Sequence, residues 1–190
     1  MQTLINTIKT FIPLSGTEEA LVADLFREIQ LPKGSYFVKE GQVCKYVGFL
    51  QEGLLRYYIN KDGQELTYEF ARAGEFTCNY ASFLDQSPSD ENIQVLENTS
   101  MLTISHNNLQ VFYDKIAAGN KFGRLVVESI FVRAKRQIAS LYSDPPDVRY
   151  LQFMDLYPDL QQRIPQYYIS SYVGVKPPSL SRIRKRLSMP

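Results

Sequence analysis

The chain has 190 residues, of which 44% are hydrophobic and 22% charged, and its formal net charge is +1. This balance is typical of a soluble globular protein with room for one ordinary domain and a smaller one. No stretch approaches the roughly 18 apolar residues that a membrane helix needs, and the N-terminus lacks the charged start and apolar block of a signal peptide, so we expect a cytoplasmic protein without a membrane partner.

Cysteine and histidine are too few for a metal centre. Cys44 and Cys78 stand 34 positions apart without a CxxC spacing, and His106 is the only histidine. An iron–sulfur cluster, a structural zinc site or a cupin-like metalloenzyme needs more clustered ligands. We therefore expect no metal, no cofactor and no catalytic residues. Two buried free thiols are the default expectation, and a redox disulfide is the alternative.

The first predicted element is an amphipathic helix over residues 17–30. Leu21, Leu25 and Ile29 are spaced by four, which places them on one helical face. Ser15 and Glu18 have the spacing of a capping box at the start of this helix.

A long β region is expected from residue 31 to residue 104. Short runs alternate apolar and polar residues, and glycines interrupt them about every ten residues, at Gly34, Gly41, Gly53, Gly63 and Gly74. Asp62 followed by Gly63 is a strong hairpin-turn signal. Glycines at such spacing suit the corners of a small roll, so the pattern predicts a compact antiparallel β-roll.

Two helices are expected after the β region. Ser105 is placed to cap the first, which contains Leu109 and Phe112, and the second runs from about residue 120 to residue 141. Apolar residues cover more of the second helix than one packing face needs. We therefore expect a homodimer through this helix; a core helix inside a monomer is the alternative.

Consecutive prolines at Pro145 and Pro146 end the long helix, because proline cannot continue one. The segment 143–147 is therefore the expected boundary between two domains, residues 1–142 and residues 143–190. A short helix is expected over residues 148–157.

The end of the chain is basic. Six of the 21 basic residues and none of the 20 acidic residues follow Asp159, so 15 basic and 20 acidic residues lie in the part up to Asp159. The net charge is thus −5 for residues 1–159 and +6 for residues 160–190. A basic module appended to an acidic one is the electrostatic footprint of nucleic-acid binding, and a solvated basic helix is the alternative.

The pattern beneath this charge predicts a helix-turn-helix. Gly174 permits a left-handed turn between two short helices, and the small Ser170 suits their crossing. Pro177 suits the first position of the second helix. The inner face of that helix is apolar and consists of Leu180, Ile183 and Leu187. Its outer face suits a recognition helix in a major groove and contains Ser181, Arg182, Lys185 and Arg186.

This order of parts resembles the Crp/Fnr family of bacterial transcription regulators over nearly the whole chain. The most specific segments, residues 160–166, 169–175 and 180–184, read LQQRIPQ, ISSYVGV and LSRIR, and they look like a Bacteroidetes-type branch. The resemblance implies an α+β fold with three parts. These are an N-terminal cyclic-nucleotide-binding-like antiparallel β-roll, a long dimerisation helix and a C-terminal helix-turn-helix.

The ligand cassette departs from the family's pattern. Nucleotide-binding members carry Phe-Gly-Glu after the last turn glycine and Arg-Ser or Arg-Thr further on, whereas this chain reads FTC over residues 76–78 and SPSDE over residues 87–91. A cyclic phosphate without a guanidinium fork and near carboxylates is disfavoured, so we expect no binding of cyclic AMP. For an unidentified small-molecule effector, the candidate pocket residues are Cys78, Tyr80, Ser89 and Asp90.

The resemblance implies a sequence-specific regulator that binds palindromic double-stranded DNA as a homodimer, with RNA polymerase as a further partner. The candidate DNA contacts are Gln166, Lys176, Ser179, Ser181, Arg182, Lys185 and Arg186. Only residues 188–190 follow Leu187, so we expect no β-wing after the recognition helix. The alternative function is a ligand-binding or adaptor protein that no longer reads DNA.

Overall fold

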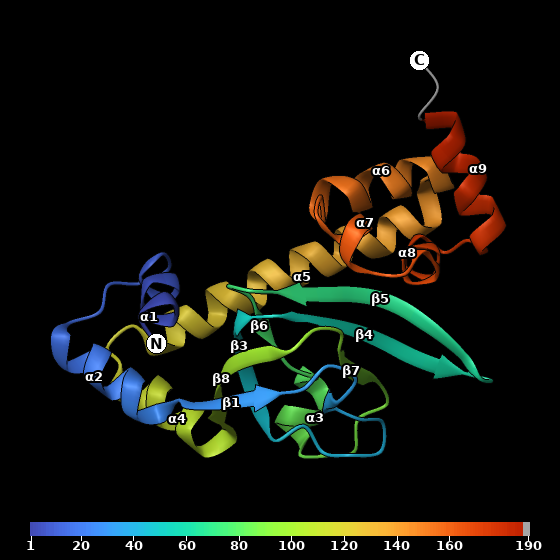
Figure 1. Ribbon diagram of the computed structural model, residues 1–190. Coiled ribbons are helices and arrows are strands. Elements are labelled where there is room, and N and C mark those ends of the chain that lie inside the picture. The colour runs from blue at the N-terminus through green and yellow to red at the C-terminus, as the bar shows by residue number, and fades with distance from the viewer. Residues whose placement is uncertain (188–190) are drawn as a thin grey trace. The chain divides into compact units, whose positions relative to one another are not determined.

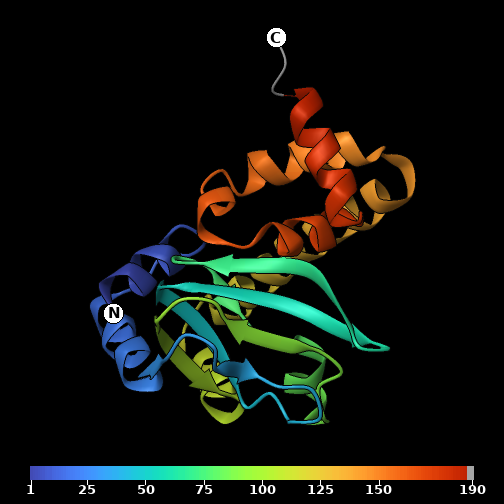
Figure 2. The same cartoon turned by 45° about the vertical axis from the view of Figure 1, so that its right-hand side comes forward.

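The computed structural model describes residues 1–187 and has a mixed α+β fold, whose elements are labelled in Figure 1 and seen from a second side in Figure 2. The chain divides into two compact units, each continuous in space but not in sequence. The first unit comprises Met1–Ile59 and Phe70–Ser129, and the second comprises Asn60–Glu69 and the chain from Ile130 onward. The boundary expected between residues 142 and 143 is a division by function and stays a prediction.

The strands are β1 (Arg27–Leu31), β2 (Tyr36–Val38), β3 (Tyr46–Glu52), β4 (Leu54–Lys61), β5 (Gln64–Arg72), β6 (Phe76–Thr77), β7 (Asn92–Val95) and β8 (Thr99–Ser105). They form two four-stranded sheets with the orders β1-β8-β3-β6 and β2-β7-β4-β5. Strand β8 pairs antiparallel with β1 and β3, and β7 pairs antiparallel with β2 and β4. The expected antiparallel β architecture is confirmed.

Strand β4 is buried on both of its faces over residues 54–58, and one of these faces packs against β7. On β4, Leu55 and Tyr57 lie opposite Val95 and Ile93 of β7. All four side chains are buried, because they share the face that the roll turns inward.

The predicted glycine turns are confirmed. Every one of the predicted turn glycines has a positive φ, as has Asp62, so Asp62 and Gly63 form the hairpin turn between β4 and β5. Gly53 is the most constrained of them. Its φ is +108°, and a Cβ built there would lie 2.1 Å from Thr99 Oγ1. Only glycine therefore lets the β3–β4 turn pass so close to β8.

The helix predicted over residues 17–30 is too long. Helix α2 spans Gly16–Leu25, and its capping box of Ser15 and Glu18 is confirmed. Residues 27–31 instead form β1, whose five residues pair with β8. The prediction failed here because pairing along the open edge of β8 outweighs a helical spacing of apolar residues.

Two short helices were not predicted. Helix α1 (Gln2–Lys9) buries Leu4, Ile5 and Ile8. Helix α3 (Tyr80–Asp85) interrupts the predicted β region and begins after Asn79, whose side chain accepts a hydrogen bond from the Ser82 N–H. The alternation of apolar and polar residues in this region did not indicate so short a helix.

The two helices predicted after the roll are confirmed. Helix α4 (His106–Lys115) is capped by Ser105, and helix α5 spans Gly119–Ser143. Phe122, at the start of α5, packs against the rings of Phe11, Phe76 and Phe112 at centroid distances of 5.6, 5.8 and 5.5 Å. These contacts fix the first turn of α5 in the first unit. Among residues 1–187, no helix is long and apolar enough to cross a membrane.

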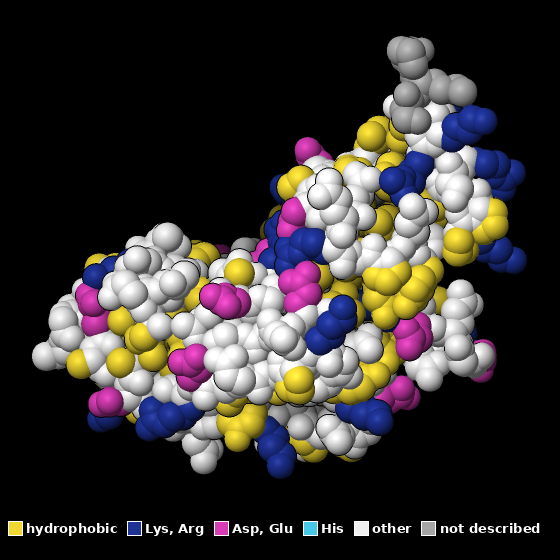
Figure 3. All heavy atoms as spheres, in the orientation of Figure 1, with side chains coloured by type: hydrophobic (Ala, Val, Ile, Leu, Met, Phe, Trp, Pro, Cys, Tyr) yellow, Lys and Arg dark blue, Asp and Glu magenta, His cyan; other side chains and the backbone are white. Residues whose placement is uncertain are grey.

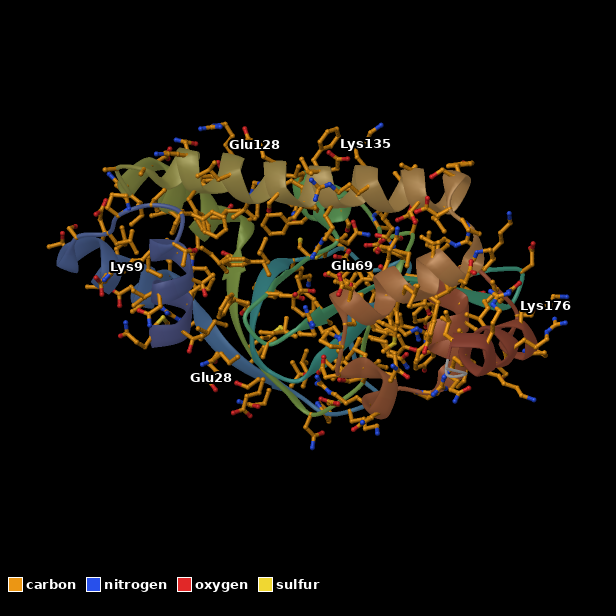
Figure 4. The ribbon with its side chains drawn as sticks, turned by 90° about the horizontal axis from the view of Figure 1, so that it is seen from above. Lys9, Glu28, Glu69, Glu128, Lys135 and Lys176 are labelled. Atoms are coloured by element: carbon orange, nitrogen blue, oxygen red, sulfur yellow. The ribbon has the colours of Figure 1, made fainter. Side chains whose placement is uncertain are left out.

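The second unit consists of helices that pack with residues 60–69 of the β4–β5 hairpin. Its helices besides the second half of α5 are α6 (Pro146–Leu156), α7 (Leu160–Arg163), α8 (Gln166–Val173) and α9 (Pro177–Leu187). Ser171 Oγ accepts a hydrogen bond from the Thr67 N–H at 2.8 Å and donates one to the Glu65 carbonyl at 3.0 Å. On α5, Arg133 forms an ion pair with Glu69 (labelled in Figure 4). Strand β5 is thus bound to both α5 and α8.

The C-terminal part differs from the predictions at the start of α6 and at Leu187. Helix α6 begins at Pro146 rather than at Val148, because proline is well suited to a first helical turn. Leu187 is 41% exposed rather than inward-facing, because it is the last residue of α9 and no described element covers it. The predicted absence of a β-wing concerns residues 188–190, which lie outside the described residues.

The close approach at Gly53 can be tested by comparing two alanine variants. Gly34 has a φ of +88° and open space around its Cβ position, whereas Gly53 combines a positive φ with a clash against Thr99. Gly34→Ala should lower the free energy of unfolding by about 1 kcal/mol, and Gly53→Ala by about 3 kcal/mol or more. Urea denaturation measures both values. Equal losses would contradict the tight packing of the β3–β4 turn on β8.

Candidate nucleic-acid interface and effector pocket

Helices α8 and α9 are joined by a sharp turn. Gly174 ends α8 in the left-handed conformation, with φ 75° and ψ 38°, and its N–H donates to the Ser170 carbonyl. Helix α9 begins at Pro177, as predicted, and the Lys176 carbonyl accepts the Ser179 N–H at 2.9 Å. Lys176 therefore lies in the connection at the start of α9, where it is exposed (Figure 4).

The inner sides of these helices are apolar. Ile169 and Val173 of α8 and Leu180 and Ile183 of α9 are buried. Ser170 is only 2% exposed, and its Oγ donates to the Tyr167 carbonyl at 2.9 Å. A small buried side chain without an unsatisfied hydroxyl allows two helices to pack closely, which is consistent with the role expected of Ser170 between α8 and α9.

The outer side of α9 presents polar and basic groups, and Figure 3 shows lysine and arginine side chains gathered over this helix. Ser181, Arg182, Lys185 and Arg186 are exposed. Arg182 Nη2 donates to Ser179 Oγ at 3.2 Å, which restrains the guanidinium near the start of the helix. Ser181 Oγ instead donates to the Pro177 carbonyl at 3.2 Å.

Arg186 has an acidic partner that the sequence did not reveal. Its Nη2 lies 2.8 Å from Asp147 Oδ2, in an ion pair between α9 and the start of α6. A shallow hollow at this place is lined by Pro145, Pro146, Asp147, Val175, Ser179, Arg182, Ile183 and Arg186. An exposed pair of this kind contributes about 0–1 kcal/mol, so a phosphate can replace the carboxylate at little cost.

A second hollow brings together Gln166, Ser181, Arg184 and Lys185. The seven candidate DNA residues are thus divided. Gln166 and Ser181 lie with Lys185 around this second hollow, Ser179 and Arg182 lie with Arg186 around the first, and Lys176 is in the lining of neither. Arg184 was not among the candidates. It is half-buried beside the apolar face, four residues after Leu180, and its Nη2 donates to Gln161 Oε1 at 3.4 Å. Its helical position next to the inner face was the signal that could have identified it.

The candidate effector residues lie around the start of α3. Ser89 is buried, and its Oγ accepts a hydrogen bond from Asn79 Nδ2 at 2.8 Å and donates one to the Glu91 carbonyl at 2.7 Å. Through Asn79 the structure brings Ser89 close to Cys78. Asp90 is exposed, so its carboxylate is hydrated.

Tyr80 points to a different set of neighbours. Its ring is 40% exposed and stacks on Phe83 at 6.4 Å. Burial raises the pKa of Tyr80, and burial together with the nearby Tyr80 raises the pKa of Tyr113 to about 12, so both phenols are neutral at physiological pH.

The roll also contains a buried arginine that sequence analysis did not single out. Arg56 on β4 is fully buried, its guanidinium lies 4.2 Å from the centre of the Tyr58 ring, and its Nη1 donates to Gln94 Oε1 at 3.3 Å. The alternation of β4 places Arg56 and Tyr58 on one face. That face is opposite to the one with Leu55 and Tyr57.

The two cysteines are brought together although 34 positions separate them. Cys44 is buried and Cys78 is partly exposed, and their sulfur atoms lie 3.6 Å apart as free thiols. Spacing in the sequence gave no sign of this contact, because it depends on how the segments around β3 and α3 pack.

Comparison with known proteins gives a domain family and a fold. The family model described as the cyclic nucleotide-binding domain matches residues 28–115. A search of curated proteins by sequence found no match.

Several solved structures are similar in fold. The catabolite activator protein of Thermus thermophilus is 17% identical, with a TM-score of 0.60 over 96% of this chain and 86% of that chain. A candidate transcriptional regulator of the Crp/Fnr family from Eubacterium rectale is 15% identical, with a TM-score of 0.70 over 94% and 87%. FixK2 from Bradyrhizobium japonicum is 16% identical, with a TM-score of 0.73 over 85% and 84%. Residues 28–115 thus form a domain of the cyclic nucleotide-binding type, and the chain shares its fold with Crp/Fnr-type proteins.

Proposed function

We propose that the chain is a transcription regulator that binds a palindromic DNA operator as a homodimer. The observation that carries this proposal is helix α9, which is buried on one side by Leu180 and Ile183 and exposes Ser181, Arg182 and Lys185 on the other. A left-handed glycine turn before it completes the arrangement of a helix-turn-helix. An exposed basic helix face of this kind fits the major groove of DNA.

The similarity in fold supports the same assignment. Crp/Fnr-type proteins and a catabolite activator protein share the fold over most of this chain. We place the chain in the Bacteroidetes-type branch on its own motifs in residues 160–184. The functional domains are residues 1–142, for an effector and for dimerisation, and residues 143–190, for DNA, with RNA polymerase as a further partner.

Selection of bound duplexes from a random DNA pool tests this function directly. The purified chain should enrich a palindrome whose half-sites are centred about 10 base pairs apart, because two symmetry-related helices reach successive major grooves on one face of DNA. A pool that stays random after repeated rounds of selection would contradict the proposal.

The second candidate function is a ligand-binding or adaptor protein that no longer reads DNA. The ion pair between Arg186 and Asp147 favours it, because it occupies one of the outward basic groups. Retention on DNA or heparin that weakens with salt distinguishes the regulator from this alternative.

An exposed apolar face on α5 supports the homodimer. Phe131, Ile138 and Leu141 are 63%, 51% and 47% exposed. With Ala134 they follow a spacing of three and four residues, which is that of the seam between two coiled helices. Ile130, Val132 and Tyr142 are also exposed at 46%, 46% and 91%. A soluble chain gains stability when a second copy covers such a patch.

The dimer can be tested by changing the charge at this seam. Ile138→Glu or Ile130→Glu should give monomers, because a carboxylate would lose its hydration at the seam. Arg136→Glu, on the opposite side of α5, is the matched control and should leave the dimer intact. Sedimentation measures the assembly, and a parent chain that is monomeric at micromolar concentration would contradict the dimer.

The position of Arg182 supports a role in base recognition. It lies in the second turn of α9, and its bond to Ser179 Oγ reduces the freedom that binding would otherwise remove. Guanidinium groups at this part of a recognition helix make paired hydrogen bonds with guanine. Lys185 and Arg186 lie about one turn further on and are assigned to phosphates.

Alanine variants should separate these two roles. Arg182→Ala should cost about 1–3 kcal/mol of binding and relax base preference at one position in each half-site, whereas Lys185→Ala should weaken all sequences alike and reduce the salt dependence. Arg124→Ala, which removes the same charge from the exposed start of α5, is the control and should do neither. Measured affinities for single-base variants of the operator decide the matter. Altered base preference in Lys185→Ala alone would show that the helix is oriented differently.

The effector site should reject cyclic nucleotides. Asp90 and the half-buried Glu91 stand where nucleotide-binding relatives have an arginine, and the hydroxyl of Ser89 is already engaged by Asn79 and Glu91. A phosphate diester would meet carboxylates there without a guanidinium partner. Titration calorimetry with cyclic AMP and cyclic GMP should therefore give no heat of binding. Saturable binding of either one in the micromolar range would refute this account of the cassette.

A further inference from the structure

Cys44 and Cys78 form a contact that the proposed function does not use. Cys44 lies just before β3 and Cys78 directly follows β6, so the two thiols belong to segments that only the folded roll brings together. Their sulfur atoms are 3.6 Å apart. A disulfide bond of about 2.0 Å would require the sulfurs to approach by roughly 1.5 Å.

The backbone on both sides of the contact is held in place. The Cys44 N–H donates to Ser82 Oγ at 2.9 Å, and the Cys78 N–H donates to Tyr57 Oη at 3.2 Å. Ser82 and Tyr57 are themselves buried. The two thiols therefore face each other as a result of the fold, and chance rotation of exposed side chains does not explain their contact.

The local hydrogen bonds distinguish the two sulfurs. The two sulfur atoms are hydrogen-bonded to each other, and this contact, with the Asn79 N–H, lowers the pKa of Cys44. The same contact and burial raise the pKa of Cys78. Of the two thiols, Cys44 therefore loses its proton more readily.

The solvent exposure of the two cysteines does not follow the order of their pKa values. Cys78 is partly exposed, whereas Cys44 is fully buried. A reagent from solution meets Cys78 first, and Cys44 lies behind it within contact distance. This is the arrangement of an accessible cysteine with a resolving cysteine.

We propose that Cys44 and Cys78 are a redox-active dithiol that a hydroperoxide oxidises reversibly to an intramolecular disulfide. The ionised Cys44 sulfur accepts the proton of Cys78 while the Cys78 sulfur attacks the outer oxygen of the hydroperoxide. The O–O bond breaks, Cys78 becomes a sulfenic acid, and the alkoxide or hydroxide that leaves takes a proton from water. Cys44 then attacks the sulfenic acid sulfur, the S–S bond forms, and the hydroxyl leaves as water with the Cys44 proton. The two thiols lose two electrons to the O–O bond, and a small thiol restores them by exchange.

The bond would connect the segment before β3 to the start of α3. Asn79, next to Cys78, caps α3 and binds Ser89, so oxidation acts directly on the candidate effector residues. Disulfides in cytosolic proteins are commonly transient and redox-sensing, which is consistent with a pair that is free in the reduced chain.

The test needs no DNA, so its outcome is independent of the proposed function. The full chain is treated with hydrogen peroxide and digested without reduction. We expect both thiols to be lost together, a digest fragment that links residues 44 and 78, a mass lower by two hydrogen atoms, and full recovery with dithiothreitol. Persistence of both thiols, a disulfide between two chains or conversion to sulfinic acids would each overturn the proposal.

Single serine variants identify the roles of the two sulfurs. Cys44→Ser should leave a sulfenic acid at Cys78 that dimedone traps, because the resolving thiol is absent. Cys78→Ser should leave Cys44 unreacted under the same treatment, because Cys44 is buried. Reaction of Cys44 at the parent rate in Cys78→Ser would contradict the order of steps. Circular dichroism establishes that both variants are folded, and Cys44→Ala replaces Cys44→Ser if the hydroxyl is not tolerated.

Discussion

The aromatic cluster around Phe122 is the contact on which the organisation of the chain depends. Phe11, Phe76 and Phe112 come from the N-terminal segment, the roll and α4, and all three pack on Phe122. This fixes the beginning of α5 against the roll. Helix α5 continues without interruption to Ser143. Its second half binds β5 through a hydrogen bond to the Tyr68 carbonyl and also has the exposed apolar face. One helix therefore belongs to both compact units.

Within the second unit, hydrogen bonds to the backbone join helices α5 and α8 to residues 65–68 of β5. Ser171 bonds two backbone groups of residues 65–67, and Gln137 donates to the Tyr68 carbonyl. Helix α8 is thus bound to β5 within the second unit through polar contacts with defined geometry.

Several buried polar side chains of the roll lie together at the start of α3. The buried side chains Asn79, Ser82 and Ser89 bond one another and the backbone there, beside the two thiols. These groups lie within the residues that match the cyclic nucleotide-binding domain.

The sequence by itself determined the features that depend on neighbouring residues. The capping box at Ser15, the turn at Asp62 and Gly63, the left-handed Gly174 and the start of α9 at Pro177 each follow from local backbone chemistry. Tertiary structure alone decided which distant groups meet. Residues 27–31 form β1 because they pair with the open edge of β8. Arg186 forms an ion pair with Asp147, and the sulfur of Cys44 contacts that of Cys78. These contacts join segments that lie tens of residues apart, so no local pattern encodes them.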